Sequence, residues 1–139
     1  MRDVRIGVAG LIAVAVVAAT AGAAAQSAQV FEGKQKFELY CATCHGAEGK
    51  GDGTLAKQLR TRPADLTQLA KKYDGKFPAD KVAQLIDGRT RDAAHLKADM
   101  PVWGEVFSKA QGGTDPNAVK DRIDALVKYL ETIQEKPKA

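Results

Sequence analysis

The feature that most constrains this chain of 139 residues is a five-residue motif, Cys41, Ala42, Thr43, Cys44 and His45. Its two cysteines are the only ones in the sequence. The spacing C-x-x-C-H is typical of covalent haem attachment, in which two thiols add to the vinyl groups on one edge of a porphyrin and the adjacent imidazole binds the iron. A bulky group of this kind would help so small a chain to build its core.

Three other interpretations of the motif are a disulfide, half of a zinc site and a thioredoxin-type redox pair. A zinc site needs four ligands, and beyond the motif the sequence has no cysteine and only His95. A thioredoxin pair follows a strand in a βαβ unit, and no β-rich run precedes Cys41. In an oxidising compartment the two thiols could simply pair, but the spacing of the motif favours haem attachment.

The first 25 residues have the pattern of a secretory signal. Arg2 and Arg5 form a short basic region, residues 6–19 are almost entirely apolar, and residues 23–25 form an A-x-A cleavage site. The apolar run of about 14 residues is shorter than the roughly 20 that a membrane-spanning helix needs, which favours cleavage over a retained anchor. We therefore expect residues 1–25 to be removed and residues 26–139 to form one domain in the periplasm.

The charge of the chain argues against a nucleic-acid-binding protein. The net charge of +4 becomes +3 when Arg2, Asp3 and Arg5 are removed with the signal. The positive residues are scattered, and no stretch interleaves basic with aromatic residues as a nucleic-acid surface would. Their spread is compatible with a weak docking face for an acidic protein partner.

Iron bound by His45 has a second axial position to fill or leave open. The predicted mature chain contains one methionine, Met100, and one further histidine, His95. Pro101 biases Met100 toward an extended conformation, which suits a rigid loop that presents a side chain to a buried metal. A thioether is a soft donor that favours Fe(II) and raises the reduction potential. We expect Met100 as the sixth ligand; the alternatives are ligation by His95 and an open site.

Apolar spacing predicts a helix near each end of the mature chain. Residues 30–40, just before the motif, have helix-compatible spacing, and Gly33 would let another helix cross at close range. Asp115 is a candidate N-cap, with Pro116 in the first helical position. The strongest amphipathic pattern of the chain follows, with its apolar positions at Val119, Ile123, Leu126, Leu130 and Ile133.

Less regular structure is predicted between these helices. Residues 80–87 form a short helix that ends at Gly88, residues 64–72 are a weaker helix candidate, and the rest is loop. The glycine-rich residues 46–53 lack the context of a dinucleotide-binding loop and the acidic spacing of a calcium loop. We expect these glycines to let the backbone turn tightly past the haem edge.

Residues 30–133 resemble the class I c-type cytochromes, the bacterial monohaem relatives of the mitochondrial carrier. The resemblance rests first on the haem motif with Cys41, Cys44 and His45, and on the pair Met100 and Pro101. Four further positions match packed residues of the family's first and last helices: Gly33, Phe37, Leu126 and Tyr129. It implies an all-α fold in which the N- and C-terminal helices cross and short helices and loops wrap around one covalently bound haem c.

The resemblance also implies roles for residues near the haem. In the family, a backbone carbonyl of a proline-containing loop accepts the Nδ1 proton of the haem histidine, and Pro63 resembles that position. Such a bond fixes the orientation of the imidazole ring. Arg62 either faces a haem propionate or is solvated, and Trp103 is expected to lie against the porphyrin, as a shield for the iron or as a core residue.

Iron with both axial positions filled exchanges electrons but does not easily bind a substrate, so we expect an electron carrier and not an enzyme. We expect a monomer that passes single electrons between redox partner proteins, with no membrane span after signal cleavage. One alternative is a haem subunit of a larger periplasmic dehydrogenase or oxidase complex, whose mark would be an exposed apolar patch. Another is a haem enzyme or gas sensor with a labile sixth ligand, although beyond His95 the sequence shows no evident group of acids and bases for such chemistry.

Overall fold

The computed structural model describes residues 9–89, 99–110 and 115–136, with side chains from residue 22 onward except that of Pro116. Every regular element in these ranges is helical, which confirms the predicted all-α class. Five elements are α-helices and three are short 3-10 helices: α1 (Ala9–Tyr40), α2 (Ala42–His45), η1 (Ala56–Gln58), η2 (Leu66–Gln68), η3 (Lys71–Tyr73), α3 (Ala79–Asp87), α4 (Trp103–Ala110) and α5 (Pro116–Thr132).

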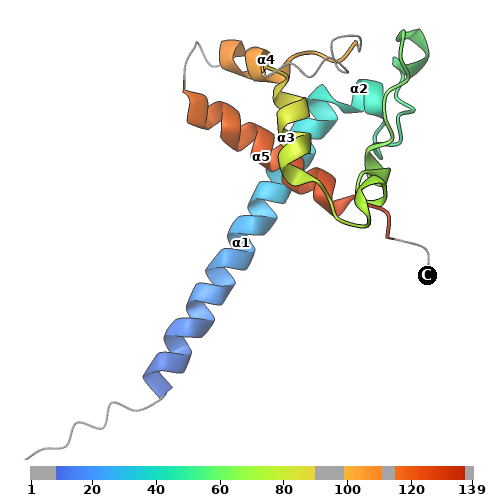
Figure 1. The fold of residues 1–139 in the computed structure, drawn as a ribbon. Helices are drawn as coiled ribbons and strands as arrows, with labels where there is room; N and C mark the ends of the chain where they lie inside the picture. The colour runs from blue at the N-terminus through green and yellow to red at the C-terminus, as the bar shows by residue number, and fades with distance from the viewer. Residues whose placement is uncertain (1–8, 90–98, 111–114, 137–139) are drawn as a thin grey trace, which may run out of the picture.

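The centre of the fold is the crossing of α1 and α5 (Figure 1). At Gly33, a Cβ atom would lie 1.9 Å from the backbone oxygen of Ala125 and 2.9 Å from Cβ of Tyr129. One turn later, the ring of Phe37 is almost fully buried and its centroid lies 5.3 Å from that of Tyr129. The backbones of the two helices meet at Gly33, which confirms the predicted close crossing.

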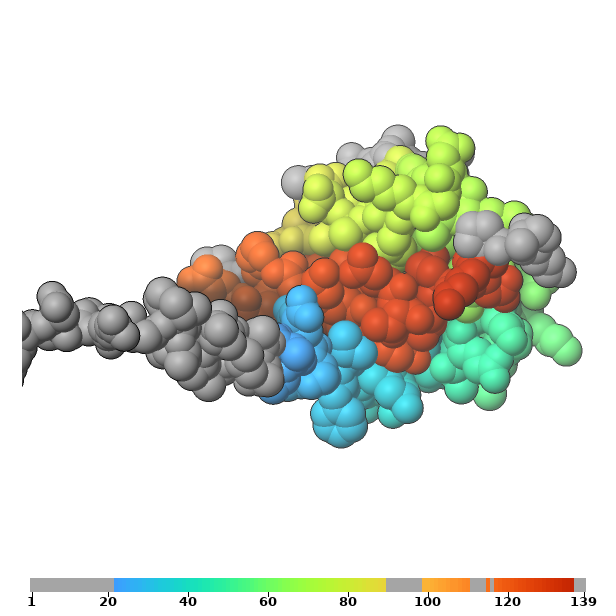
Figure 2. All heavy atoms as spheres, turned by 90° about the horizontal axis from the view of Figure 1, so that it is seen from below, coloured from blue at the N-terminus to red at the C-terminus, as the bar shows by residue number. Residues whose placement is uncertain are grey.

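The helix α5 begins at the predicted residue and buries the predicted apolar face. The side chain of Asp115 accepts a hydrogen bond from the backbone N–H of Asn117 at 2.9 Å, and Pro116 is the first helical residue. Ile133, the last of the five predicted apolar positions, is half-buried. The other four are buried: Val119, Ile123, Leu126 and Leu130. In Figure 2, α5 lies between α1 on one side and α3 with its preceding chain on the other. The helix α5 therefore packs against neighbours on two sides.

The short helix α3 also follows its prediction. It ends where Gly88 adopts a left-handed conformation, with φ +66°, and donates its N–H to the carbonyl of Gln84 at 2.9 Å. Val82 and Ile86 face the core and are buried. A glycine is suited to this C-terminal position because a Cβ atom disfavours positive φ.

The helix predicted over residues 64–72 is wrong, because Asp65 within the segment and Gln134 outside it bond to its backbone groups. The Asp65 carboxylate accepts from the N–H and the hydroxyl of Thr67 at 2.9 and 2.6 Å, which tightens the turn into η2. Gln134 donates to the carbonyl of Leu66 and accepts from the N–H of Ala70, both at 2.8 Å. The segment forms η2 and η3 instead of one α-helix.

The helix α4, by contrast, falls where loop was predicted. Its apolar residues Trp103, Val106, Phe107 and Ala110 follow helical spacing, which is the signal that could have revealed it. Phe107 is almost fully buried against the core. The neighbouring proline and glycine, Pro101 and Gly104, obscure this pattern because both residues disfavour helix interiors.

The first part of α1 projects away from the packed helices (Figure 1), and α1 is continuous across residue 25, where cleavage is expected. Removal of residues 1–25 as a signal stays a prediction, and residues 1–8 lie outside the described part of the chain. Among the residues that the structure describes, no helix is both long enough and apolar enough to cross a membrane.

The Asp115 cap supplies the first testable prediction. We expect Asp115→Ala to lower the free energy of unfolding by about 1 kcal/mol, because the N–H of Asn117 loses its acceptor at the start of α5. Urea unfolding of the holoprotein measures the loss. The matched control is Asp121→Ala, which removes an exposed carboxylate from the same helix. Equal losses in the two variants would contradict a capping role.

Candidate haem site

The haem motif forms the turn at which α1 ends and α2 begins. Cys41 is the N-cap of α2, and its carbonyl accepts the N–H groups of Cys44 and His45 at 3.1 and 2.9 Å. Residues three and four positions apart share one face of such a turn. Cys41, Cys44 and His45 therefore lie on one face, and the two thiols are not joined in a disulfide.

Burial favours the uncharged forms of Cys41 and His45. Burial, together with the nearby Cys44, raises the pKa of the Cys41 thiol to about 12, so this group is a neutral thiol at pH 7. Burial also lowers the pKa of His45 below its ordinary value, against a smaller opposite effect of its hydrogen bond to Ala64. A neutral imidazole is the form that binds a metal.

The orientation of His45 is set by a backbone carbonyl. Its Nδ1 lies 3.0 Å from the carbonyl oxygen of Ala64. A carbonyl only accepts, so Nδ1 carries the proton and Nε2 keeps its lone pair for a metal. The expected acceptor was the carbonyl of Pro63; the structure places it one residue later, at Ala64.

The glycine-rich loop folds back onto the motif, which confirms the tight turn expected there. The N–H of Gly51 donates to the carbonyl of His45 at 2.7 Å, and that of Gly53 to Cys44 at 3.1 Å. A Cβ on Gly51, whose φ is +75°, would lie 2.4 Å from the carbonyl oxygen of Pro63. The loop thus links the motif to the chain that carries the Ala64 carbonyl.

This contact predicts that alanine destabilises the protein more at Gly51 than at Gly75. Gly51 and Gly75 both have positive φ, +75° and +83°, but a Cβ on Gly75 would meet nothing within 4 Å. Alanine strains the backbone at both positions, and only at Gly51 does it also collide with Pro63. We expect Gly51→Ala to lower the free energy of unfolding by roughly 1–3 kcal/mol more than Gly75→Ala. Chemical unfolding of both holoproteins measures this, and equal losses would contradict it.

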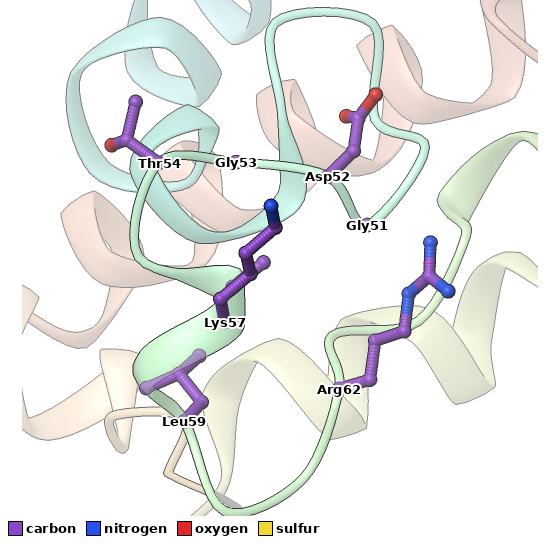
Figure 3. Close-up of a pocket in the computed structure, with 8 residues that line it drawn as sticks. Gly51, Asp52, Gly53, Thr54, Lys57, Leu59 and Arg62 are labelled. Carbon is purple, nitrogen blue, oxygen red and sulfur yellow. The ribbon is translucent and has the colours of Figure 1, made fainter.

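A cavity of about 610 Å³ lies beside the glycine-rich loop (Figure 3). Figure 3 shows Lys57 rising from η1 and Arg62 standing across from it, with Leu59 below. Both cationic side chains belong to exposed residues. Arg62, predicted to face a propionate or solvent, thus lines this cavity together with Lys57.

Met100 belongs to a loop that an ion pair ties to the chain after η1. Its side chain is half-buried and packs against the same core as Cys41 and Ala42. The neighbouring Asp99 receives hydrogen bonds from Arg60, which hold the pKa of this carboxyl below its usual range and keep it ionised at neutral pH. The competing ligand, His95, lies outside the described residues.

Trp103 lies in an aromatic cluster at the start of α4. Its ring centroid is 5.6 Å from that of Tyr40 and 5.6 Å from that of Phe107, and the residue is half-buried. These distances are typical of favourable aromatic pairs. Trp103 thus joins the end of α1, directly before Cys41, to the helix that follows Met100.

The residues present fit a covalently bound haem. Two unpaired thiols and an imidazole with a free Nε2 share one turn, and no competing group of three or more metal-binding side chains occurs in the described ranges. Nothing in the sequence marked Ala64 or Arg60 as part of this site. Both act on neighbours distant in the sequence, so only the folded chain reveals them.

Comparison with known proteins agrees with the chemistry of the motif. The protein-family model described as Cytochrome c matches residues 30–134, a range that contains both the haem motif and Met100. No curated protein and no solved structure matches the chain.

Proposed function

Since the chain belongs to the cytochrome c family, we propose that it shuttles single electrons in the periplasm through a haem c whose iron is bound by His45 and Met100. The family binds haem c covalently and serves haem-based electron transfer. In this proposal Cys41 and Cys44 form the two thioether links, and the protein carries electrons between partner proteins without acting as an enzyme.

The observation that carries the proposal is the hydrogen bond from His45 to Ala64 at 3.0 Å. It holds the imidazole in the tautomer that leaves Nε2 free and fixes the plane of the ring. A ligand that is already oriented moves little when the charge of the metal changes. The haem supplies an iron that alternates between Fe(II) and Fe(III), and His45 supplies a fixed axial donor to it.

Met100 completes the proposed ligand pair. It is the only methionine left once the predicted signal is removed, and it is half-buried beside the core that also contacts Cys41. A thioether donor favours Fe(II), so the protein would have a higher reduction potential than one with two imidazole ligands. A filled sixth position also keeps small molecules away from the metal.

Partner binding is proposed to use positive charge near the motif. Lys57 and Arg62 are exposed on opposite sides of the cavity in Figure 3. Such charges attract an acidic protein and give fast association that weakens with salt. The measurable expectation is an electron-transfer rate with an acidic redox protein that falls steeply as ionic strength rises.

A redox titration of the holoprotein followed by absorption tests the proposal. We expect one reversible transition that involves one electron, no binding of carbon monoxide to the ferrous form, and no turnover of peroxide. Stoichiometric binding of carbon monoxide would contradict a filled sixth position. Sustained peroxide turnover would favour the alternative of a haem enzyme.

A second candidate is a haem subunit of a larger complex, whose mark would be a contiguous exposed apolar patch. Phe31 and Leu39 on α1 are 62% and 68% exposed. These two side chains are the apolar groups on α1 that such a partner would cover. Sedimentation of the purified holoprotein separates the two candidates: a stable monomer supports the free carrier, and purification only together with a partner supports the subunit.

A further inference from the structure

One ion pair joins two loops that are distant in the sequence. The Nε and Nη2 atoms of Arg60 donate to Oδ1 of Asp99 at 3.0 and 2.8 Å. The backbone N–H of Arg60 donates to Oδ2 of the same carboxylate at 2.7 Å. Both oxygens of Asp99 are thus held by one residue, 39 positions away.

This geometry differs from that of an ordinary surface ion pair. Pairs such as Lys34 with Glu38 and Lys120 with Asp124 join side chains one turn apart on a helix, and solvent-exposed pairs contribute little. The side chain of Arg60 is itself 81% exposed, whereas that of Asp99 is 20% exposed. What distinguishes this pair is that Asp99 accepts three hydrogen bonds from Arg60. One of them comes from the backbone N–H, whose position costs no side-chain entropy.

The segment that holds Asp99 also holds His45. Arg60 begins a stretch of five residues that ends at Ala64, whose carbonyl accepts the Nδ1 proton of His45. Residues 60 and 64 are four peptide units apart, at most about 14 Å even when fully extended. Pro63 restricts its own φ and favours an extended conformation at the residue before it. A short, stiff segment therefore contacts both the proximal histidine and the neighbour of Met100.

We propose that Arg60 and Asp99 are positioning residues that hold Met100 at the iron, an inference that rests on the proposed ligation by His45 and Met100. Asp99 restrains Met100 from its N-terminal side, and Pro101 restricts it from the other. Segment 60–64 then fixes both axial donors relative to one another. Arg60 and Asp99 themselves contact no ligand atom of the site.

Restraint of the Met100 loop would hinder exchange of Met100 for a foreign ligand at the iron. A foreign ligand such as imidazole reaches the sixth position only if Met100 leaves, and Met100 leaves only if its loop moves. The bonds of Asp99 to Arg60 oppose this movement. Removing them makes the opened form more populated, and the apparent affinity for imidazole rises in proportion.

Imidazole titration of ferric holoprotein variants tests this. We expect Asp99→Ala and Arg60→Ala to raise imidazole affinity about three- to tenfold, with unchanged haem content. The effect of the double variant should match that of Asp99→Ala alone, because Asp99→Ala already removes all three hydrogen bonds, whereas Arg60→Ala keeps the one from its backbone. Arg60→Lys, which keeps the charge but loses the fork, should fall between Arg60→Ala and the original protein.

The matched control is Asp124→Ala, which breaks an exposed ion pair on α5. The proposal predicts that this variant binds imidazole as the original protein does. It is overturned if Asp99→Ala and Arg60→Ala change imidazole affinity less than twofold, or no more than Asp124→Ala does. If the unaltered ferric protein lacks the far-red absorption of an iron–thioether bond, the ligation by Met100 fails and the positioning role fails with it. If that absorption is present and the variants are silent, the positioning role alone fails.

Discussion

Replacement of Met100 by leucine is expected to lower the reduction potential of the holoprotein on the order of 0.1 V, within the range of about 0.8 V that axial ligands span in haem proteins. Leucine has a similar volume, so the core that Met100 borders should be little disturbed. The lost thioether removes a donor that favours Fe(II). The ferrous variant should also bind carbon monoxide, which the original protein should not. Redox titration and a carbon monoxide difference spectrum measure the two effects.

The control for this prediction is Val102→Ala in the same loop. Val102 is half-buried and packs beside Gly88, and its side chain has no atom that binds iron. We expect this variant to retain the original potential within the error of the measurement and to remain unable to bind carbon monoxide. If Met100→Leu behaves like Val102→Ala, another group completes the coordination of the iron.

Replacement of Gly33 by alanine is expected to destabilise the crossing of α1 and α5 strongly. The new Cβ would lie 1.9 Å from the backbone oxygen of Ala125. A backbone atom cannot rotate away, so α1 and α5 must separate and loosen the contact of Phe37 with Tyr129. We expect a loss of about 3 kcal/mol in the free energy of unfolding, which corresponds to a fall in Tm on the order of 10 °C or more.

A loss of stability in Gly33→Ala would itself indicate a collision between α1 and α5. At an open helical position, glycine to alanine stabilises a helix by about 1 kcal/mol, so a loss at Gly33 measures the collision itself. Gln35→Ala on the exposed face of α1 is the control and should leave Tm nearly unchanged. A stable Gly33→Ala holoprotein would show that the helices do not meet as closely as the structure indicates.

Features encoded in short stretches of sequence were predictable. The haem motif and the apolar stripe of α5 each follow from residues within a few turns of one another, and both the Asp115 cap and the Gly88 helix end are local signals. Gly33 could be predicted as a crossing point because a glycine in an otherwise suitable helix implies a close neighbour. Its partner on α5, the Ala125 carbonyl, required the structure.

Features that depend on distant partners were not predictable. Residues 66–70 bond to Gln134, which lies after the last helix, and therefore do not form the predicted α-helix. The acceptor for His45 is Ala64 and not Pro63, a shift of one residue that no local pattern in the sequence marks. The pair of Arg60 and Asp99 spans 39 positions, and no local pattern marks it.

The absorption spectrum of the purified ferric holoprotein tests the central claim most directly. An iron–thioether bond produces a weak charge-transfer band in the far red. Ligation by His45 and Met100 predicts that this band is present in the original protein and absent from Met100→Leu. Its absence from the original protein would contradict ligation by Met100, since the sixth position would then be filled by His95 or be open.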